Sequence, residues 1–154
     1  MEIQELIKMI YENNISQLKK LKDDGVDFSI LDSYTKRNLL IAYSSYGYNE
    51  HYTQKEMVEF LLESGIDVNY QANGRNNSKS ALHNAVAIGH MEIVKSLLEN
   101  GAILEIKDRN GNTPLWNKVM MCRGQKQNIE MIEYLVSKGS SFDTKNNHDS
   151  SARK

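Results

Sequence analysis

The sequence contains one cysteine, Cys122, and one proline, Pro114. A single cysteine excludes a disulfide within the chain and a zinc site with several thiolates, and it is typical of a reducing compartment. With one proline and nine glycines, no Pro- or Gly-rich linker is expected. No run of about 18 apolar residues occurs, so we expect no membrane partner. The acidic start, Met1–Glu5, is unlike a secretory signal, and we expect a cytoplasmic, single-domain protein over residues 1–154.

The sequence also has little excess charge of either sign. The formal net charge is −1, with 8 basic and 12 acidic residues in 1–77 and 11 basic and 8 acidic residues in 78–154. A nucleic-acid binder needs a basic stripe that displaces many counterions, so no nucleic-acid partner is expected. No Gly-rich phosphate loop, nucleophile elbow, His-Glu-x-x-His motif or catalytic carboxylate pair occurs. We therefore expect no cofactor and no enzymatic activity.

A repeating period is the main positive feature of the sequence. Ser80 and Thr113 are 33 residues apart, and each is followed by alanine or proline and then leucine. Around Leu82, apolar residues recur at helical spacing in two short runs, separated by Gly89 and ended by Gly101. An apolar run that closes on glycine occurs four times, at Gly25, Gly65, Gly101 and Gly139. The pattern predicts helix pairs that are too short to be stable alone and must pack on their neighbours.

These motifs resemble those of the ankyrin-repeat family. The family's Thr-Pro-Leu-His phrase is matched by Ser80-Ala81-Leu82-His83 and Thr113-Pro114-Leu115-Trp116, and partly by Arg37-Asn38-Leu39-Leu40. The resemblance implies an all-α solenoid of about four stacked helix-turn-helix units with β-hairpin-type connecting loops. The approximate bounds are 1–33, 34–76, 77–109 and 110–147, and residues 148–154 would be the start of a truncated fifth unit or a frayed tail.

The same resemblance implies a protein-binding module, in which hairpin tips line one edge beside a concave face of first helices. Lys36, Arg75 and Arg109 fall on three successive tips, which suits a partner with an acidic patch. Tyrosine, tryptophan and arginine supply much of the binding energy at protein interfaces. The predicted partner contacts are Tyr34, Lys36, Tyr46, Tyr48, Tyr52, Arg75, Asn77, Arg109, Asn110, Asn112, Trp116 and Arg123.

Other interpretations of these residues stay open. Asn, Asp and Gly at the tips are also the residues that tight turns need. Trp116 could fill the space of the family's histidine between units, and we expect Met120 and Met121 to pack in the core. The resemblance implies that His83 hydrogen-bonds between units. No metal site is predicted, because no acidic residue or cysteine completes a ligand set with His83 and His90.

Within protein binding, two roles are considered. The small size, the absence of an attached effector domain and the irregular insertions resemble bacterial ankyrin proteins that act as inhibitors or immunity factors for toxins. An adaptor that joins two proteins is the alternative. An enzyme that uses Cys122 ranks below both, because no histidine lies near it in the sequence to act as a base. We expect the free protein to be monomeric.

Overall fold

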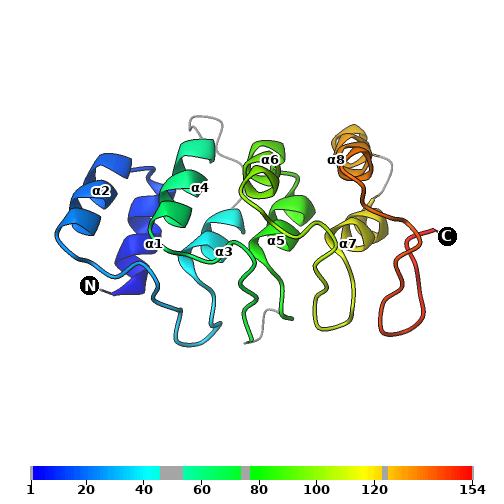
Figure 1. The fold of residues 1–154 in the computed structure, drawn as a ribbon, viewed down its shortest axis with the longest axis horizontal. Helices are drawn as coiled ribbons and strands as arrows, with labels where there is room; N and C mark the ends of the chain where they lie inside the picture. Colours follow the sequence, from blue (N-terminus) through cyan, green and yellow to red (C-terminus); the bar gives the residue numbers. More distant parts are fainter. Residues whose placement is uncertain (1, 46–53, 74–76, 123–124, 154) are drawn as a thin grey trace.

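The computed structural model describes residues 2–45, 54–73, 77–122 and 125–153. Within these ranges the chain forms eight α-helices and no strand. They are α1 (Ile3–Tyr11), α2 (Ile15–Asp23), α3 (Leu39–Ser44), α4 (Gln54–Glu63), α5 (Ala81–Ile88), α6 (Met91–Glu99), α7 (Pro114–Met121) and α8 (Lys126–Ser137). The helices form four pairs in a row (Figure 1). The prediction of an all-α solenoid of helix pairs is confirmed.

The first helix of each of the last three pairs begins at a polar capping residue. Asn38, Ser80 and Thr113 are the N-caps of α3, α5 and α7, and each side-chain oxygen accepts the backbone N–H three positions further on. Such a cap satisfies one of the free N–H groups of the first turn and stabilises a helix by about 1 kcal/mol. Asn38 therefore keeps the capping function although its unit departs from the repeat phrase.

The second helices, α2, α4, α6 and α8, all end in the same way. The four closing glycines predicted from the sequence have φ between +83° and +103°, a left-handed conformation that glycine adopts at little cost. The residue after each glycine donates its N–H to a leucine carbonyl five positions earlier, as Ala102 does to Leu97 at 2.9 Å. These glycines therefore terminate the second helix of each pair.

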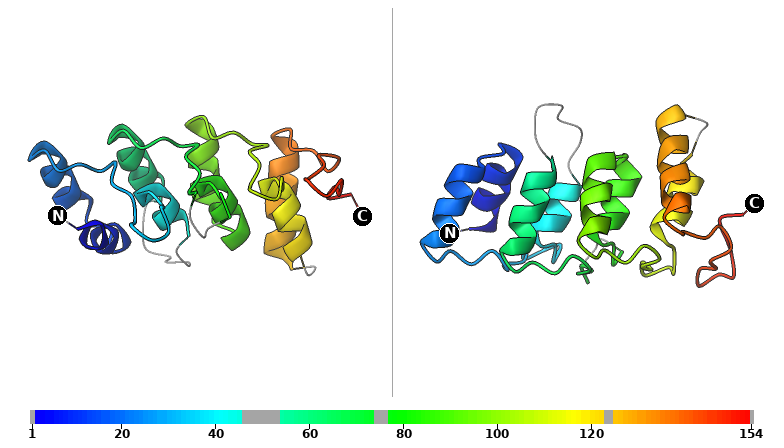
Figure 2. Two further views of the ribbon diagram at one scale, coloured as in Figure 1. Left: turned by 90° about the horizontal axis from the view of Figure 1, so that it is seen from below. Right: turned by 45° about the horizontal axis from the view of Figure 1, so that its top comes forward.

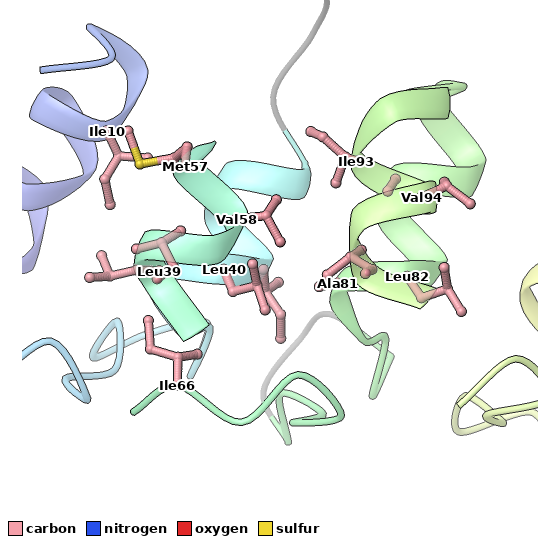
Figure 3. Packing of buried hydrophobic residues seen from close by; sticks show 14 of the residues in the cluster. Ile10, Leu39, Leu40, Met57, Val58, Ile66, Ala81, Leu82, Ile93 and Val94 are labelled. Atoms are coloured by element: carbon pink, nitrogen blue, oxygen red, sulfur yellow. The ribbon is translucent and has the colours of Figure 1, made fainter. Parts of the chain in front are cut away.

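The buried apolar side chains form one continuous core from α1 to α8. In the middle of the row, Leu40 of α3 lies close to Val58 of α4 on one side and to Ala81 of α5 on the other (Figure 3). The first helices α3 and α5 each lie between two other first helices. Helix α3 contacts α1 and α5, and α5 contacts α3 and α7. Helices of six to twelve residues are not stable alone, so the stacking holds them in place.

The pairs are arranged in two layers, with α1, α3, α5 and α7 in one and α2, α4, α6 and α8 in the other (Figure 2). The loops that connect one pair to the next project from a single edge of the row (Figure 1). Among the described residues, no helix is both long enough and apolar enough to cross a membrane.

After Gly139 the chain forms one more loop on the same edge. The N–H of Asn146 donates to the carbonyl of Ser150 at 2.9 Å, and the N–H of Arg153 donates to that of Phe142 at 3.1 Å. Ala152 is buried at 5% exposure. These bonds join the two sides of the loop, up to residue 153.

Candidate functional site

Three tips of the connecting loops are built on one kind of turn. Asp32, Asp108 and Asn146 each accept two backbone N–H groups of their own turn through one side-chain oxygen. The hydroxyl and N–H of Thr35 stabilise the Asp32 carboxylate and lower its pKa. A residue with positive φ follows in each turn, namely Lys36, Gly111 or Asp149. At these three positions, Asp and Asn therefore serve the turn, as one of the sequence interpretations proposed.

Neighbouring tips are joined to each other by hydrogen bonds. In each case the hydroxyl or backbone N–H of one loop donates to a backbone carbonyl of the loop beside it. The bonds are Tyr70 to Lys36 at 2.9 Å, Arg109 to Asn77 at 3.0 Å and Asn147 to Asn110 at 2.9 Å. Because these bonds run from loop to loop, they hold the described parts of the connecting loops together along one edge.

Four of the predicted partner contacts are exposed along this edge. Tyr34 is 61% exposed, and Lys36, Arg109 and Asn110 are also exposed. Asn77 is half-buried beside them. We call Tyr34, Lys36, Arg109 and Asn110 the tip row. It offers one aromatic ring, two cations and one amide from loops whose backbones are held in place.

Asn112, another predicted contact, has a structural position. It is 7% exposed, and its N–H donates to Asp108 at 3.0 Å. Its side-chain oxygen accepts from the Asn146 amide at 2.8 Å, and its backbone oxygen lies 3.1 Å from Nε2 of His83. Asn112 therefore links three parts of the protein and does not belong to the tip row.

Five predicted contacts lie outside the described residues: Tyr46, Tyr48, Tyr52, Arg75 and Arg123. The tyrosine-rich insertion between α3 and α4 therefore stays a prediction. Within the described ranges, no three His, Cys, Asp or Glu side chains gather closely enough to hold a metal ion. Cys122 is half-buried at the end of α7, where its N–H donates to the Val119 carbonyl.

His83 joins the third helix pair to the loop that precedes the fourth. Its Nδ1 faces the backbone N–H of Ser80 at 3.2 Å and therefore accepts, so Nε2 carries the proton and donates to the Asn112 carbonyl. The neutral ring thus satisfies both nitrogens, and Nδ1 also lies 3.0 Å from the Ser80 hydroxyl. Burial lowers the pKa of His83, outweighing the opposite effects of the Asn112 carbonyl and Asp108. The predicted contact between units is confirmed.

This geometry predicts that the protein loses stability in mild acid. Below the unfolded-state pKa of about 6.5, the unfolded chain binds a proton at His83 that the folded chain does not. The free energy of unfolding should therefore be at its full value above that pH and fall as the pH drops toward the folded-state pKa, by up to about 1.4 kcal/mol per pH unit. Urea unfolding between neutral and mildly acidic pH measures this slope.

The variant His83→Gln provides the control for this prediction. It removes the titrating ring but leaves His90 and His148 in place. We expect it to be less stable than the wild type at neutral pH and to have a shallower loss in acid. Equal slopes for the two proteins would show that His83 does not cause the acid sensitivity.

Two methionines of α7 lie elsewhere than expected. Met120 is 46% exposed and Met121 is 54% exposed, so the expectation that they pack in the core is wrong. Trp116, in contrast, is half-buried at the position that His83 has in the preceding pair. Its indole Nε1 is buried and has no hydrogen-bond partner among the described residues. The apolar surface of α7 is therefore at its carboxyl end, away from the tip row.

Lys118 is the residue that the sequence reasoning missed. Its side chain is buried at 2% exposure, and its Nζ donates to the Ala87 carbonyl of α5 at 3.2 Å. The signal was its position, three residues after the leucine of the repeat phrase, where the third unit has the buried Ala85. A buried lysine is unusual at this position, where the third unit has a small apolar residue.

Comparison with known proteins identifies a family and several relatives to which this chain is similar. Residues 50–146 match the family described as ankyrin repeats (3 copies). The E3 ubiquitin-protein ligase Ufd4 of Drosophila melanogaster is 33% identical over 112 residues, which is 72% of this chain and 4% of that protein. A putative ankyrin repeat protein of Rickettsia bellii is 29% identical over 138 residues, 89% of this chain and 48% of that protein. An ankyrin repeat-containing protein of Schizosaccharomyces pombe is 31% identical over 88 residues, 57% of this chain and 37% of that protein. The chain spans less than half the length of each of these relatives.

Proposed function

Because the chain belongs to the ankyrin-repeat family, we propose that it is a non-catalytic module that binds a folded protein partner through the tip row. The observation that carries this proposal is the set of hydrogen bonds that joins successive tips. Side chains on a backbone that is already ordered lose less conformational entropy on binding than side chains on a mobile loop. The tip row is therefore a preorganised contact surface.

The chemistry of the tip row favours a partner with an acidic patch. Lys36 and Arg109 are exposed cations on two of the tips. Complementary charges at the rim of an interface mainly raise the association rate and reject wrong partners. Tyr34, at 61% exposure, adds an aromatic side chain of the kind that carries binding energy once buried.

Two narrower roles fit a protein-binding module. One is an inhibitor or immunity factor for a bacterial toxin, which would hold a single partner. An adaptor that joins two proteins is the alternative, and it must hold both at once. The ligase activity named for Ufd4 belongs to a protein of which this chain spans 4%. Sedimentation of the chain with its captured partners distinguishes a binary inhibitor complex from a ternary adaptor complex.

Reversing the two cations of the tip row should weaken partner binding strongly. In the double variant Lys36→Glu and Arg109→Glu, we expect the Kd for a partner captured from an extract of the native host to rise at least about tenfold. Most of the change should be in the association rate and should shrink at high salt, because exposed charges are screened. Surface plasmon resonance at two salt concentrations measures both quantities.

The double variant Lys20→Glu and Lys138→Glu is the matched control. It changes the net charge by the same amount at exposed positions on α2 and just after α8, away from the tips. We expect partner binding close to that of the wild type, and an unchanged helical signal in both double variants. An equal loss of binding in the two would mean that overall charge, and not the tip row, determines capture.

A further inference from the structure

A hollow of about 470 Å³ opens where the carboxyl ends of α5 and α7 meet the start of α8. Its lining includes Lys118, Ile88, Met120 and Met121. The tips precede the amino ends of the first helices, whereas this hollow lies at the opposite ends of two of them. We call it the Lys118 hollow. It is separate from the tip row.

The cation beside this hollow is poorly paired. The Lys118 ammonium has three N–H donors, and one of them reaches the Ala87 carbonyl at 3.2 Å. Within the described part of the chain, no carboxylate lies within ion-pairing distance of it. Burial accordingly lowers the pKa of Lys118. A buried ammonium with so few acceptors costs free energy, and a carboxylate brought in by a ligand would recover part of it.

The rim of the hollow carries exposed apolar side chains beside the polar residues Gln125 and Asn128. Ile88, Met120 and Met121 are 42%, 46% and 54% exposed. They are three of the eight large apolar side chains that are exposed in the described ranges, so a large share of that set gathers at one place. A clustered apolar surface of this kind marks an interaction site more often than scattered residues do. Methionine side chains adapt readily to different apolar partners.

We propose that the Lys118 hollow binds an amphipathic helical segment of a protein partner whose apolar face carries one carboxylate near its centre. The carboxylate pairs with Lys118, and the apolar side chains around it cover Ile88, Met120 and Met121. A helix suits this rim because residues three and four positions away on either side surround a central residue. An extended strand places its same-face neighbours along one line only. The inference rests on the proposed function and adds a second contact to it.

Lys118 also has a plain structural role, because its bond to Ala87 satisfies a free carbonyl in the last turn of α5. That role alone predicts that Lys118 has no preference for a carboxylate in a ligand. The two interpretations therefore differ in one measurable quantity, the coupling between Lys118 and an acidic residue of a bound peptide.

The probe is a synthetic peptide of about 16 residues, long enough to form a helix, with acetylated and amidated ends. It carries one central Glu, Leu three and four positions before and after it, and alanine and glutamine elsewhere. A second peptide has Gln in place of Glu. Fluorescence anisotropy gives the Kd of both peptides for the full chain and for its Lys118→Met variant, which completes a double-mutant cycle.

For the wild type, we expect the Glu peptide to bind at least about tenfold more tightly than the Gln peptide, as for a charge pair that is largely desolvated. For Lys118→Met the two peptides should bind about equally. Methionine has a similar shape and removes a buried charge, so the variant should keep the wild-type helical signal. Failure of the Glu peptide to bind, or an unchanged Glu preference in Lys118→Met, would overturn the proposal.

The apolar rim is tested with exposed residues that the fold does not need. The double variant Met120→Ser and Met121→Ser should weaken both peptides at least about tenfold, whereas Ile103→Ser, at a residue 54% exposed elsewhere, should leave both unchanged. The tip-row double variant should bind the peptides like the wild type. If the peptides fail while the tip row still captures the host partner, only the Lys118 hollow is refuted. If host capture fails and the peptides bind, the fault lies with the tip row.

Discussion

Replacing Leu82 with alanine should lower the free energy of unfolding by about 3 kcal/mol, within the usual range for buried leucines. Leu82 is 1% exposed in α5, the first helix of the third pair. That helix packs on α3 on one side and on α7 on the other, so a cavity there weakens both interfaces. Urea unfolding followed by circular dichroism measures the loss.

The variant Ile88→Ala is the control on the same helix. Ile88 is 42% exposed, so losing its side chain leaves no closed cavity, and the cost should be no more than about 1 kcal/mol. Because the main contacts between pairs in the described ranges join adjacent pairs, Leu82→Ala should also broaden the unfolding transition by separating the two halves of the row. Equal costs for Leu82→Ala and Ile88→Ala would contradict the description of stacked, mutually buried pairs.

The architecture could be predicted from the sequence because the repeated capping residues and glycines meet local requirements of the backbone. The N-cap hydroxyls of Ser80 and Thr113 and the glycines at left-handed positions are local signals that act through the chain's own backbone. Even Asn38, in the unit that departs most from the phrase, keeps its capping bond. Such signals do not depend on which residues pack against the segment in the folded protein, and for this reason the helix pairs could be predicted.

The candidate site was harder to predict because exposure depends on what packs over each residue. Met120 and Met121 are apolar by type, but the buried face of α7 runs through Leu115 and Lys118, and the two methionines lie off it. Residue type was given more weight than spacing, and the expectation was wrong. Lys118 was overlooked for the same reason, since its spacing indicated burial and its charge did not.

Asn112 illustrates a different limit. Tip asparagines are similar in sequence, yet Asn110 is exposed whereas Asn112 is buried and bonded to Asn146 and His83. The partners lie 29 residues away in α5 and 34 residues away in the last loop, and no local sequence pattern reports these bonds. Only the stacking of the units distinguishes a turn residue that faces solvent from one that links neighbouring parts of the protein.

Replacing Gly111 with alanine should destabilise the protein by roughly 2–3 kcal/mol and release the loop that follows α8. Gly111 has φ +77°, and a Cβ there would lie 2.7 Å from the backbone N of Asn147 and would also meet its side chain. Two hydrogen bonds hold Asn147 at that place: its backbone N–H donates to the Asn110 carbonyl, and its side-chain amide donates to the Arg109 carbonyl. The substitution therefore adds a backbone clash to the left-handed strain of about 1–2 kcal/mol that any side chain meets at such a φ.

The variant Gly65→Ala isolates the conformational strain from the backbone clash. Gly65 has φ +88°, but nothing lies within 4 Å of a Cβ built there, so only the conformational strain should be felt. We expect Gly111→Ala to be the more destabilising of the two, and to speed amide hydrogen exchange at Asn147 and Arg153, whereas Gly65→Ala leaves those amides protected. If both variants lose the same stability and keep that protection, the loop does not rest on Gly111. Because Asn147 bonds to Arg109 and Asn110, this contact also supports one end of the tip row, and releasing it should weaken partner binding.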